Sequence, residues 1–196
     1  VCIIDDDEAI RESLRLLLYA GGLSSAVYDS ADAYLADDMP ADFDCMILDI
    51  RMPGTDGIEL FRILNQKQLA FPVIFITGHG DIPLAVSAIK RGAYDFLTKP
   101  FQEGELLDKI RSAIDHYQSQ REQLMEIQEL RSRADSCTPR ERDVMRLLAR
   151  GLPNKGIAEA LGISPRTVEI HRAHVMEKMA AGSLPALVRM IAKLES

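Results

Sequence analysis

The chain has 196 residues, of which 47% are hydrophobic and 27% are charged, and its formal net charge is −7. This composition is typical of soluble globular proteins, and the length allows one large domain or two small ones. No apolar run approaches the length of a membrane span, and the first residues do not resemble a secretory signal segment. We expect a few residues to precede Val1 in the natural protein.

The cysteines predict a reducing environment. Cys2 and Cys45 lie in apolar, strand-like runs, Cys137 stands apart, and the three have no metal-type spacing. Buried free thiols are the expected state of the first two. We therefore expect the protein to work in the cytoplasm.

Charge is distributed unevenly along the chain. Residues 1–135 contain 13 Lys and Arg against 24 Asp and Glu, whereas residues 136–196 contain 10 against 6. An acidic body followed by a basic region predicts two domains, of which the second faces a polyanion.

Short apolar runs alternate with helical patterns through the first part of the chain. The runs predict strands over residues 1–4, 24–28, 46–48, 72–77 and 94–98. Apolar residues at helical spacing predict helices over residues 8–20, 30–35, 58–64 and 82–91, and a fifth helix from about residue 102. Five such alternations predict a doubly wound α/β fold, in which a five-stranded parallel sheet carries helices on both faces.

The fifth helix has no obvious end, because no Gly or Pro occurs between Glu105 and Thr138. Its apolar residues recur at spacings of three, four and seven and form a stripe that must be buried, comprising Ile110, Ile114, Tyr117, Leu124, Ile127 and Leu130. A second copy could cover this stripe in a short coiled coil. Alternatively, this long helix could pack against the second domain of its own chain, and the sequence favours neither.

The second domain is predicted to be small and all-helical. Thr138 and Glu141 form a capping box at the start of its first helix. Two further helices begin at Asn154 and Pro165, and the tight turn between them contains Gly162. A fourth helix follows from about residue 183. Two short helices joined by such a turn predict a helix-turn-helix.

Four strands of the predicted sheet end on polar side chains. Asp5 and Asp6 follow the first strand, Asp49 follows the third, Thr77 ends the fourth, and Lys99 follows the fifth. The carboxyl ends of parallel strands meet at one edge, where such folds bind ligands. The carboxylates could bind Mg²⁺, so that Asp49 attacks phosphorus while Thr77 and Lys99 hold the phosphoryl oxygens. Before phosphorylation, Lys99 is also expected to form a salt bridge with Asp49.

This set, with Met52-Pro53-Gly54 after Asp49 and Pro100-Phe101 after Lys99, resembles the receiver domain of two-component response regulators. The resemblance covers residues 1 to about 118 and implies a flavodoxin-like fold. It implies that Asp49 accepts a phosphoryl group from a phosphohistidine of a sensor histidine kinase. It also implies that Mg²⁺ is bound by Asp5, Asp6, Asp49 and the backbone carbonyl of Arg51.

The receiver resemblance assigns further roles near the phosphoacceptor. It implies a cis peptide bond between Lys99 and Pro100. It implies that Phe96 is an aromatic switch, which turns inward when Thr77 moves to the phosphoryl group. Plain core packing is the alternative for Phe96.

Two bulky side chains are expected to govern the lifetime of the phosphoryl group. Arg51 and His79 lie two residues beyond Asp49 and Thr77. In receivers these positions border the path of the hydrolytic water. We hypothesise that Arg51 and His79 slow dephosphorylation.

The second domain resembles the LuxR-type helix-turn-helix over nearly all of residues 136–196. The matching segments include Thr138-Pro139-Arg140-Glu141-Arg142, Gly151-Leu152-Pro153-Asn154-Lys155 and Ile163-Ser164-Pro165-Arg166-Thr167-Val168. With the receiver, they make the whole chain similar to the NarL/FixJ group, and especially to FixJ-like regulators. The implied division is a receiver over residues 1–118, a helical linker over 119–136 and a DNA-binding domain over 137–196.

By this resemblance, the helix from Pro165 to Met179 enters the major groove of double-stranded DNA. Glu169 stands where many relatives carry a basic residue, so we expect it to face a cytosine amino group or to pack against Arg172. Any one surface arginine could equally form a solvated face. The candidates for base contact are Arg166, Thr167, Glu169, His171 and Arg172, and those for phosphate contact are Lys155 and Lys178.

The two resemblances together imply a transcription regulator and not a turnover enzyme. Phosphorylation is expected to promote a homodimer that binds two half-sites on DNA. RNA polymerase is a further expected partner, and no membrane is expected. One alternative is a phosphorylation-independent DNA-binding protein whose receiver serves only for dimerisation. A phosphohydrolase is a second alternative, and the helix-turn-helix argues against it.

Overall fold

The computed structural model describes residues 1–37, 43–67, 71–78 and 81–195, and it divides into two compact units. The first unit comprises Val1–Gln120 and the second comprises Arg121–Ser196. The long helix α5 (Glu103–Asp135) contributes residues to both units. Among the described helices, none is both long enough and apolar enough to cross a membrane.

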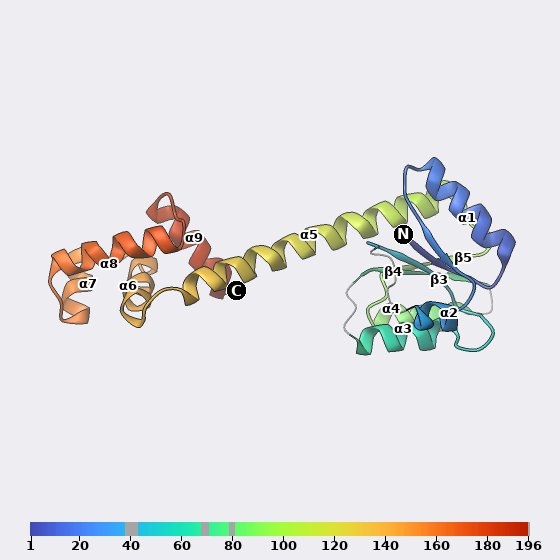
Figure 1. Cartoon of the computed structure of the whole chain (residues 1–196), viewed down its shortest axis with the longest axis horizontal. Helices are drawn as coiled ribbons and strands as arrows, with labels where there is room; N and C mark the ends of the chain where they lie inside the picture. The colour runs from blue at the N-terminus through green and yellow to red at the C-terminus, as the bar shows by residue number, and fades with distance from the viewer. Residues whose placement is uncertain (38–42, 68–70, 79–80, 196) are drawn as a thin grey trace. The chain divides into compact units, whose positions relative to one another are not determined.

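A parallel sheet of five strands forms the centre of the first unit, with the order β2-β1-β3-β4-β5 (Figure 1). Its strands are β1 (Cys2–Ile4), β2 (Ala26–Tyr28), β3 (Met46–Asp49), β4 (Val73–Thr77) and β5 (Asp95–Thr98). This arrangement confirms the predicted doubly wound fold. Because β1 pairs with both β2 and β3, the strand order reverses at β1. Folds of this kind bind ligands at the carboxyl edge beside that reversal.

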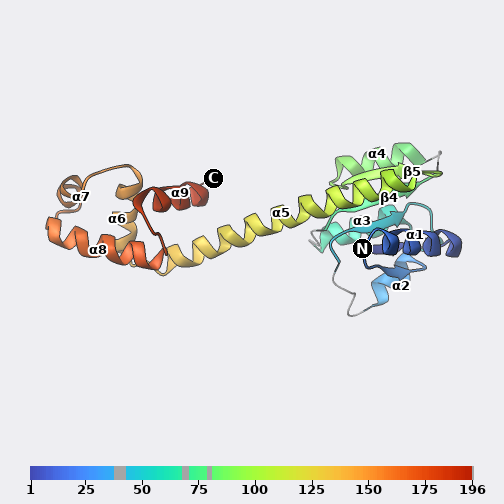
Figure 2. The ribbon, with the colours of Figure 1, turned by 90° about the horizontal axis from the view of Figure 1, so that it is seen from above.

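Helices cover both faces of the sheet (Figures 1 and 2). One face packs against α1 (Glu8–Ala20) and the first part of α5. The other face packs against α2 (Ala31–Ala36), α3 (Gly57–Gln66) and α4 (Ile82–Lys90). Successive strand residues point to opposite faces, so Ile47 joins the first core and Leu48 joins the second. Burial on both faces explains why the strands are continuous apolar runs.

Side-chain caps fix where several of these helices begin. Asp7 accepts a hydrogen bond from the backbone N of Ala9 at 2.8 Å, and Asp56 accepts one from that of Glu59 at 2.8 Å. Such caps satisfy backbone N–H groups that have no partner within the helix. Helix α4 differs, because Asp81 stands at its N-cap position but makes no side-chain cap hydrogen bond.

Helices also form the second unit, around a core of their own. Those that follow α5 are α6 (Pro139–Ala149), α7 (Asn154–Leu161), α8 (Pro165–Lys178) and α9 (Leu184–Glu195). The predicted capping box is present, since Thr138 Oγ1 accepts from Glu141 N and the Glu141 carboxylate accepts from Thr138 N. Gly162 adopts φ 64°, a left-handed conformation that lets the chain turn from α7 into α8. These features confirm the predicted helix-turn-helix.

The apolar stripe of α5 is divided along its length. Ile110 is fully buried in the core of the first unit, and Leu130 is 4% exposed in the core of the second. Leu124, which lies between them, is 61% exposed. Packing against the second domain of the same chain therefore accounts for the last turns of the stripe, and Leu124 belongs to neither core.

Candidate functional site

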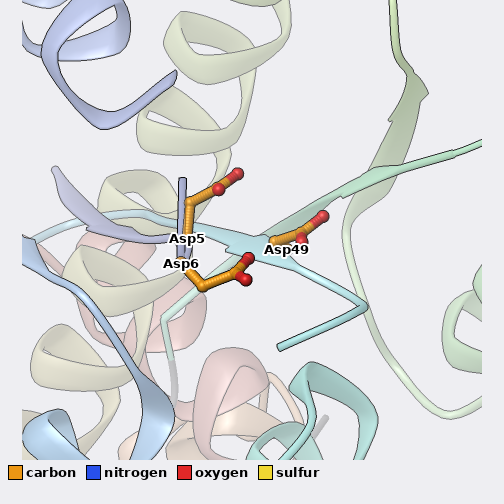
Figure 3. Close-up of side chains that lie close together, drawn as sticks. All are labelled: Asp5, Asp6 and Asp49. Atoms are coloured by element: carbon orange, nitrogen blue, oxygen red, sulfur yellow. The ribbon is translucent and has the colours of Figure 1, made fainter. Parts of the chain in front are cut away.

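Three carboxylates meet at the carboxyl edge of the sheet, beside the reversal at β1. Asp5 and Asp6 follow β1, and Asp49 ends β3, as Figure 3 shows. One carboxylate oxygen from each residue lies within 4.8 Å of the other two. Asp5 and Asp49 are 2% and 6% exposed, whereas Asp6 is open to solvent. The structure thus brings together three of the residues that the sequence assigned to a metal.

Lys99 neutralises part of this negative charge. Its Nζ lies 2.8 Å from Asp5 Oδ2 and 3.2 Å from Asp49 Oδ1. The second contact confirms the salt bridge that the sequence predicted, and the first adds a partner, Asp5, directly after β1. The peptide bond between Lys99 and Pro100 is cis, as the resemblance implied.

The electrostatics of the pocket disfavour a charged Asp49 side chain. Burial raises the pKa of Asp49 to about 6, against an ordinary value of 3.8; Lys99 opposes this rise and Asp5 adds to it. One ammonium group therefore does not compensate three crowded carboxylates. Hard divalent cations prefer clusters of carboxylate oxygens, so this donor set is consistent with a Mg²⁺ site.

Thr77 and Phe96 lie on the neighbouring strands β4 and β5. The Thr77 side chain is fully buried, and its Oγ1 donates to the carbonyl oxygen of Gly78 at 3.0 Å. Phe96 is half-buried and packs against the core beneath α3 and α4. His79, the second residue of the lifetime hypothesis, lies outside the described residues.

The loop after Asp49 depends on a glycine whose role the sequence did not reveal. Gly57 N donates to the carbonyl oxygen of Ile50 at 3.0 Å. A Cβ at Gly57 would stand 2.0 Å from the backbone oxygen of Asp49, closer than any real contact. The start of α3 can therefore approach Asp49 only because Gly57 has no side chain. The sequence signal that could have pointed to Gly57 is its position shortly after the Met52-Pro53-Gly54 motif.

A second residue that sequence reasoning missed is Asp81. Arg51, two residues beyond Asp49, donates from Nε to Asp81 Oδ1 at 2.8 Å. The two residues are 30 positions apart in the chain, so no local pattern could link them.

The helix-turn-helix presents part of the predicted DNA-binding set. Lys155, Arg166 and Glu169 are exposed, and Thr167 is half-buried beside the N-cap Ser164. Arg166 Nη1 lies 3.0 Å from Glu169 Oε2, so Glu169 pairs with Arg166 and not with Arg172. That ion pair leaves both groups at the surface of α8.

Arg172 and Lys178 instead hold helices together. Arg172 Nη1 donates to Asn154 Oδ1 at 3.3 Å, which ties α8 to α7. Lys178 Nζ lies 2.6 Å from the buried Glu141 carboxylate and donates to Ser136 O at 3.1 Å. The hydrogen bond from Lys178 is the main reason why the pKa of Glu141 falls to about 2. These contacts join α8 to the start of α6.

Two side chains of α8 differ from simple helix amphipathicity. Ile170 is apolar but 47% exposed. His171 is half-buried, and its Nδ1 is buried without a hydrogen-bond partner among the described residues.

Comparison with known proteins assigns both units to families. Residues 1–111 match the response regulator receiver domain, and residues 135–191 match the bacterial regulatory proteins of the luxR family. The chain is 48% identical to the transcriptional regulatory protein FixJ of Azorhizobium caulinodans, over 97% of this chain and 90% of that protein. It is 44% identical to FixJ of Rhizobium meliloti, over 97% of this chain and 93% of that protein.

Solved structures agree over the full length. The response regulator StyR superposes with a TM-score of 0.87 at 41% identity, covering 98% of this chain and 97% of that one. Full-length FixJ from B. japonicum gives a TM-score of 0.64 at 45% identity, covering 99% and 96%. The chain therefore belongs to the FixJ-like response regulators of two-component systems, transcription regulators that join a receiver domain to a LuxR-type DNA-binding domain.

Proposed function

We propose that Asp49 is the phosphoacceptor of this response regulator and that its phosphorylation by a sensor histidine kinase promotes dimerisation and DNA binding. The observation that carries the proposal is the buried Asp49 carboxylate, held beside Asp5, Asp6 and Lys99 at the carboxyl edge of the sheet. A transcription regulator of this family is not a turnover enzyme. The transfer is therefore a switching event.

The chemistry of the cluster supports Mg²⁺ as the cofactor. Asp5, Asp6, Asp49 and the backbone carbonyl of Arg51 would hold the ion. When bound, Mg²⁺ supplies positive charge that offsets the crowded carboxylates and the incoming phosphoryl oxygens. The open position of Asp6 leaves room for an ion to enter from solvent.

The residues of the chain then perform the transfer. An Asp49 carboxylate oxygen attacks phosphorus, the new O–P bond forms, and the P–N bond of the phosphohistidine breaks with its electron pair left on the imidazole. Lys99 exchanges its contact with Asp49 for a phosphoryl oxygen. In the resting chain the Thr77 hydroxyl donates to the carbonyl oxygen of Gly78. During the transfer it turns to donate to a second phosphoryl oxygen. Phe96 follows Thr77 inward.

The output face is proposed to be α4 with β5 and α5. Three apolar residues of α4 are unusually open, since Ile82, Leu84 and Val86 are 38%, 40% and 42% exposed. An exposed apolar patch of this kind is typical of an interaction surface. Movement of Thr77 and Phe96 would reshape this face, so that two phosphorylated chains pair and reach two half-sites.

In DNA binding, α8 is proposed to enter the major groove. Arg166, Thr167, Glu169, His171 and Arg172 remain the candidates for base contact, and Lys155 and Lys178 those for phosphate contact. We add Ile170, because an exposed apolar side chain on this helix can contact thymine methyl groups. The ion pair of Lys178 with Glu141 must compete with any phosphate contact.

We further propose the division into a receiver (1–118), a linker (119–136) and a DNA-binding domain (137–196). RNA polymerase is the proposed downstream partner of the DNA-bound dimer. The three cysteines are all buried free thiols, which supports a reducing cytoplasm as the place of action.

A mobility shift on target DNA tests the proposal. Wild type, Asp49→Ala and the control Glu12→Ala are compared with and without acetyl phosphate. Donor should strengthen binding and produce a dimer in wild type and in the control, whose exposed carboxylate lies on α1, outside the proposed dimer face. Asp49→Ala should not respond. Equal binding by all three proteins, whatever the donor, would instead favour the phosphorylation-independent regulator.

A further inference from the structure

An ion pair ties the loop after the phosphoacceptor to the start of α4. Arg51 Nη2 lies 2.6 Å from Asp81 Oδ1, and Arg51 Nε donates to the same oxygen at 2.8 Å. The Arg51 side chain is 71% exposed, whereas that of Asp81 is only 10% exposed. Asp81 thus presents a nearly buried carboxylate to a guanidinium that solvent reaches from the other side. Because the Arg51 guanidinium is exposed to solvent, it can move to another partner without passing through the protein core.

Asp81 has an alternative partner in its own helix. Aspartate at an N-cap usually accepts from a first-turn N–H, as Asp7 and Asp56 do in α1 and α3. Asp81 makes no such bond, and its backbone (φ −106°, ψ 4°) is not in the extended conformation of those two caps. Pro83, in the first turn of α4, has no N–H, and the N–H groups of Ile82 and Leu84 lack partners within the helix. The Asp81 carboxylate can therefore either pair with Arg51 or accept a hydrogen bond from a backbone N–H at the start of α4.

Arg51 likewise has a second partner once Asp49 is phosphorylated. In the resting chain the charges that act on Asp49 come from Lys99, Asp5 and Asp6. Arg51 is engaged with Asp81 instead. A phosphoryl group adds strong acceptor oxygens and further negative charge two residues away. Guanidinium–phosphate contacts are among the stronger charged hydrogen bonds, so a phosphoryl group can compete with Asp81 for Arg51.

We propose that Asp81 is a positioning residue that holds the Arg51 guanidinium away from Asp49 at rest and releases it to the phosphoryl oxygens after phosphorylation. Released Arg51 shields phosphorus from the hydrolytic water and prolongs the phosphorylated state. Freed Asp81 becomes available to cap α4, the helix that carries the proposed dimer face. This inference rests on the proposed phosphorylation of Asp49.

The test measures the lifetime of the phosphoryl group after labelling with acetyl phosphate at fixed Mg²⁺. The variants are Asp81→Asn, Arg51→Gln and the double variant. Glu59→Gln is the matched control, because it breaks an exposed two-contact ion pair, with Arg62, outside the site. Asparagine keeps the size of aspartate and glutamine that of glutamate, and the shorter glutamine at position 51 replaces a side chain that is 71% exposed, so each variant is expected to fold.

Asp81→Asn should lengthen the lifetime about two- to fivefold, the range that a partly exposed ion pair supplies. Arg51→Gln should shorten it by a similar factor. The double variant should match Arg51→Gln, because Asp81 acts only through Arg51. Glu59→Gln should match wild type. An unchanged lifetime in Asp81→Asn, or a double variant that differs from Arg51→Gln, would overturn the inference.

A second readout needs no phosphorylation. In the resting, metal-free chain, NMR should find the Nε–H of Arg51 protected from exchange in wild type and unprotected in Asp81→Asn. Equal exchange in both would overturn the resting contact. If wild type never gains a phosphoryl group, the proposed function fails together with this inference. If it gains one but the lifetimes follow another order, only the inference fails.

Discussion

At the scale of single residues, the environment of Asp49 lowers the stability of the folded chain at neutral pH. Its pKa is raised from 3.8 to about 6, chiefly by burial, so the folded chain binds more protons than the unfolded chain between these pH values. Stability must therefore fall as pH rises through this window and stay reduced above it. Asp49→Asn, which removes the charge, should unfold at higher temperature than wild type at pH 7.5 in EDTA.

The gain expected for Asp49→Asn is roughly 1–3 kcal/mol at pH 7.5, and it should vanish near pH 4, where both proteins carry a neutral group. Thermal unfolding across this range measures it. Asp115→Asn, on the exposed side of α5, is the control and should show no such trend. A gain that persists unchanged at pH 4 would mean that repacking, and not charge, is responsible.

Glu141 shows the opposite case in the second unit. Hydrogen bonds from Lys178 and from the backbone of Thr138 lower its pKa from 4.5 to about 2. The folded state then binds fewer protons than the unfolded state, so this stabilisation is complete above about pH 5 and is lost as pH falls toward 2. Glu141→Gln should unfold more easily at pH 7 and lose less stability on acidification than wild type.

Thermal unfolding of the second unit, followed through α6 and α8, checks the Glu141 prediction. The control is Glu129→Gln, because Glu129 forms an exposed ion pair with Arg133 within one helix. It should keep the acid sensitivity of wild type. Parallel acid curves for wild type and Glu141→Gln would contradict the assignment of Lys178 to a structural contact.

At the scale of elements, α3 must begin against the end of β3. Gly57→Ala would place a methyl group 2.0 Å from the Asp49 backbone oxygen, so the loop that carries the phosphoacceptor must shift. We expect a loss of about 1–3 kcal/mol in the free energy of unfolding of the first unit. Gly104→Ala is the control, because a Cβ there meets nothing within 4 Å and alanine favours the helix.

Chemical denaturation measures both glycine variants, and phosphorylation by acetyl phosphate adds a functional readout. Gly57→Ala should also accept the phosphoryl group more slowly, since Asp49 moves with its own carbonyl. Gly104→Ala should be as stable as wild type or slightly more stable. Equal stability of the two variants would show that the loop accommodates the methyl group without strain.

Strands and helices could be predicted from the sequence where the pattern of apolar residues reflects which side chains are buried. Strands β1, β3 and β4 are buried throughout, so their apolar runs are continuous, and the ends of all five strands were located within about two residues. The polar residues at the strand ends were found for the same reason. Periodicity cannot say what covers a stripe, so it could not separate Leu130, which is buried, from Leu124, which is exposed.

Contacts between distant parts of the chain were out of reach. The pair of Arg51 with Asp81 joins two loops, and the pair of Lys178 with Glu141 joins two helices. Neither pair is set by spacing in the sequence. Lys99 could be assigned to the site because it follows the end of a strand, as Asp5 and Asp49 lie at the ends of theirs. The topology of the sheet, and not proximity in sequence, therefore made this site predictable.

At the scale of the whole molecule, each unit has its own hydrophobic core, while the carboxylate cluster belongs to the first unit alone. A ligand that binds only the folded state stabilises the unit that contains its site. Mg²⁺ should therefore protect backbone amides of residues 1–120 from hydrogen exchange and leave those of residues 137–196 unchanged. The expected gain is about 2.7 kcal/mol when free Mg²⁺ exceeds its dissociation constant about a hundredfold.

Hydrogen exchange by mass spectrometry on the full chain, in EDTA and in Mg²⁺, measures this gain separately for each unit. Asp6→Asn should reduce it, because the exposed Asp6 is a proposed ligand of the ion and does not support the core. Asp115→Asn should not. Equal protection of both units would mean that the ion acts through general screening of the acidic chain, because screening does not distinguish the carboxylate cluster from any other acidic surface. If Mg²⁺ still protects only the first unit in Asp6→Asn, then Asp5 and Asp49, and not Asp6, bind the ion.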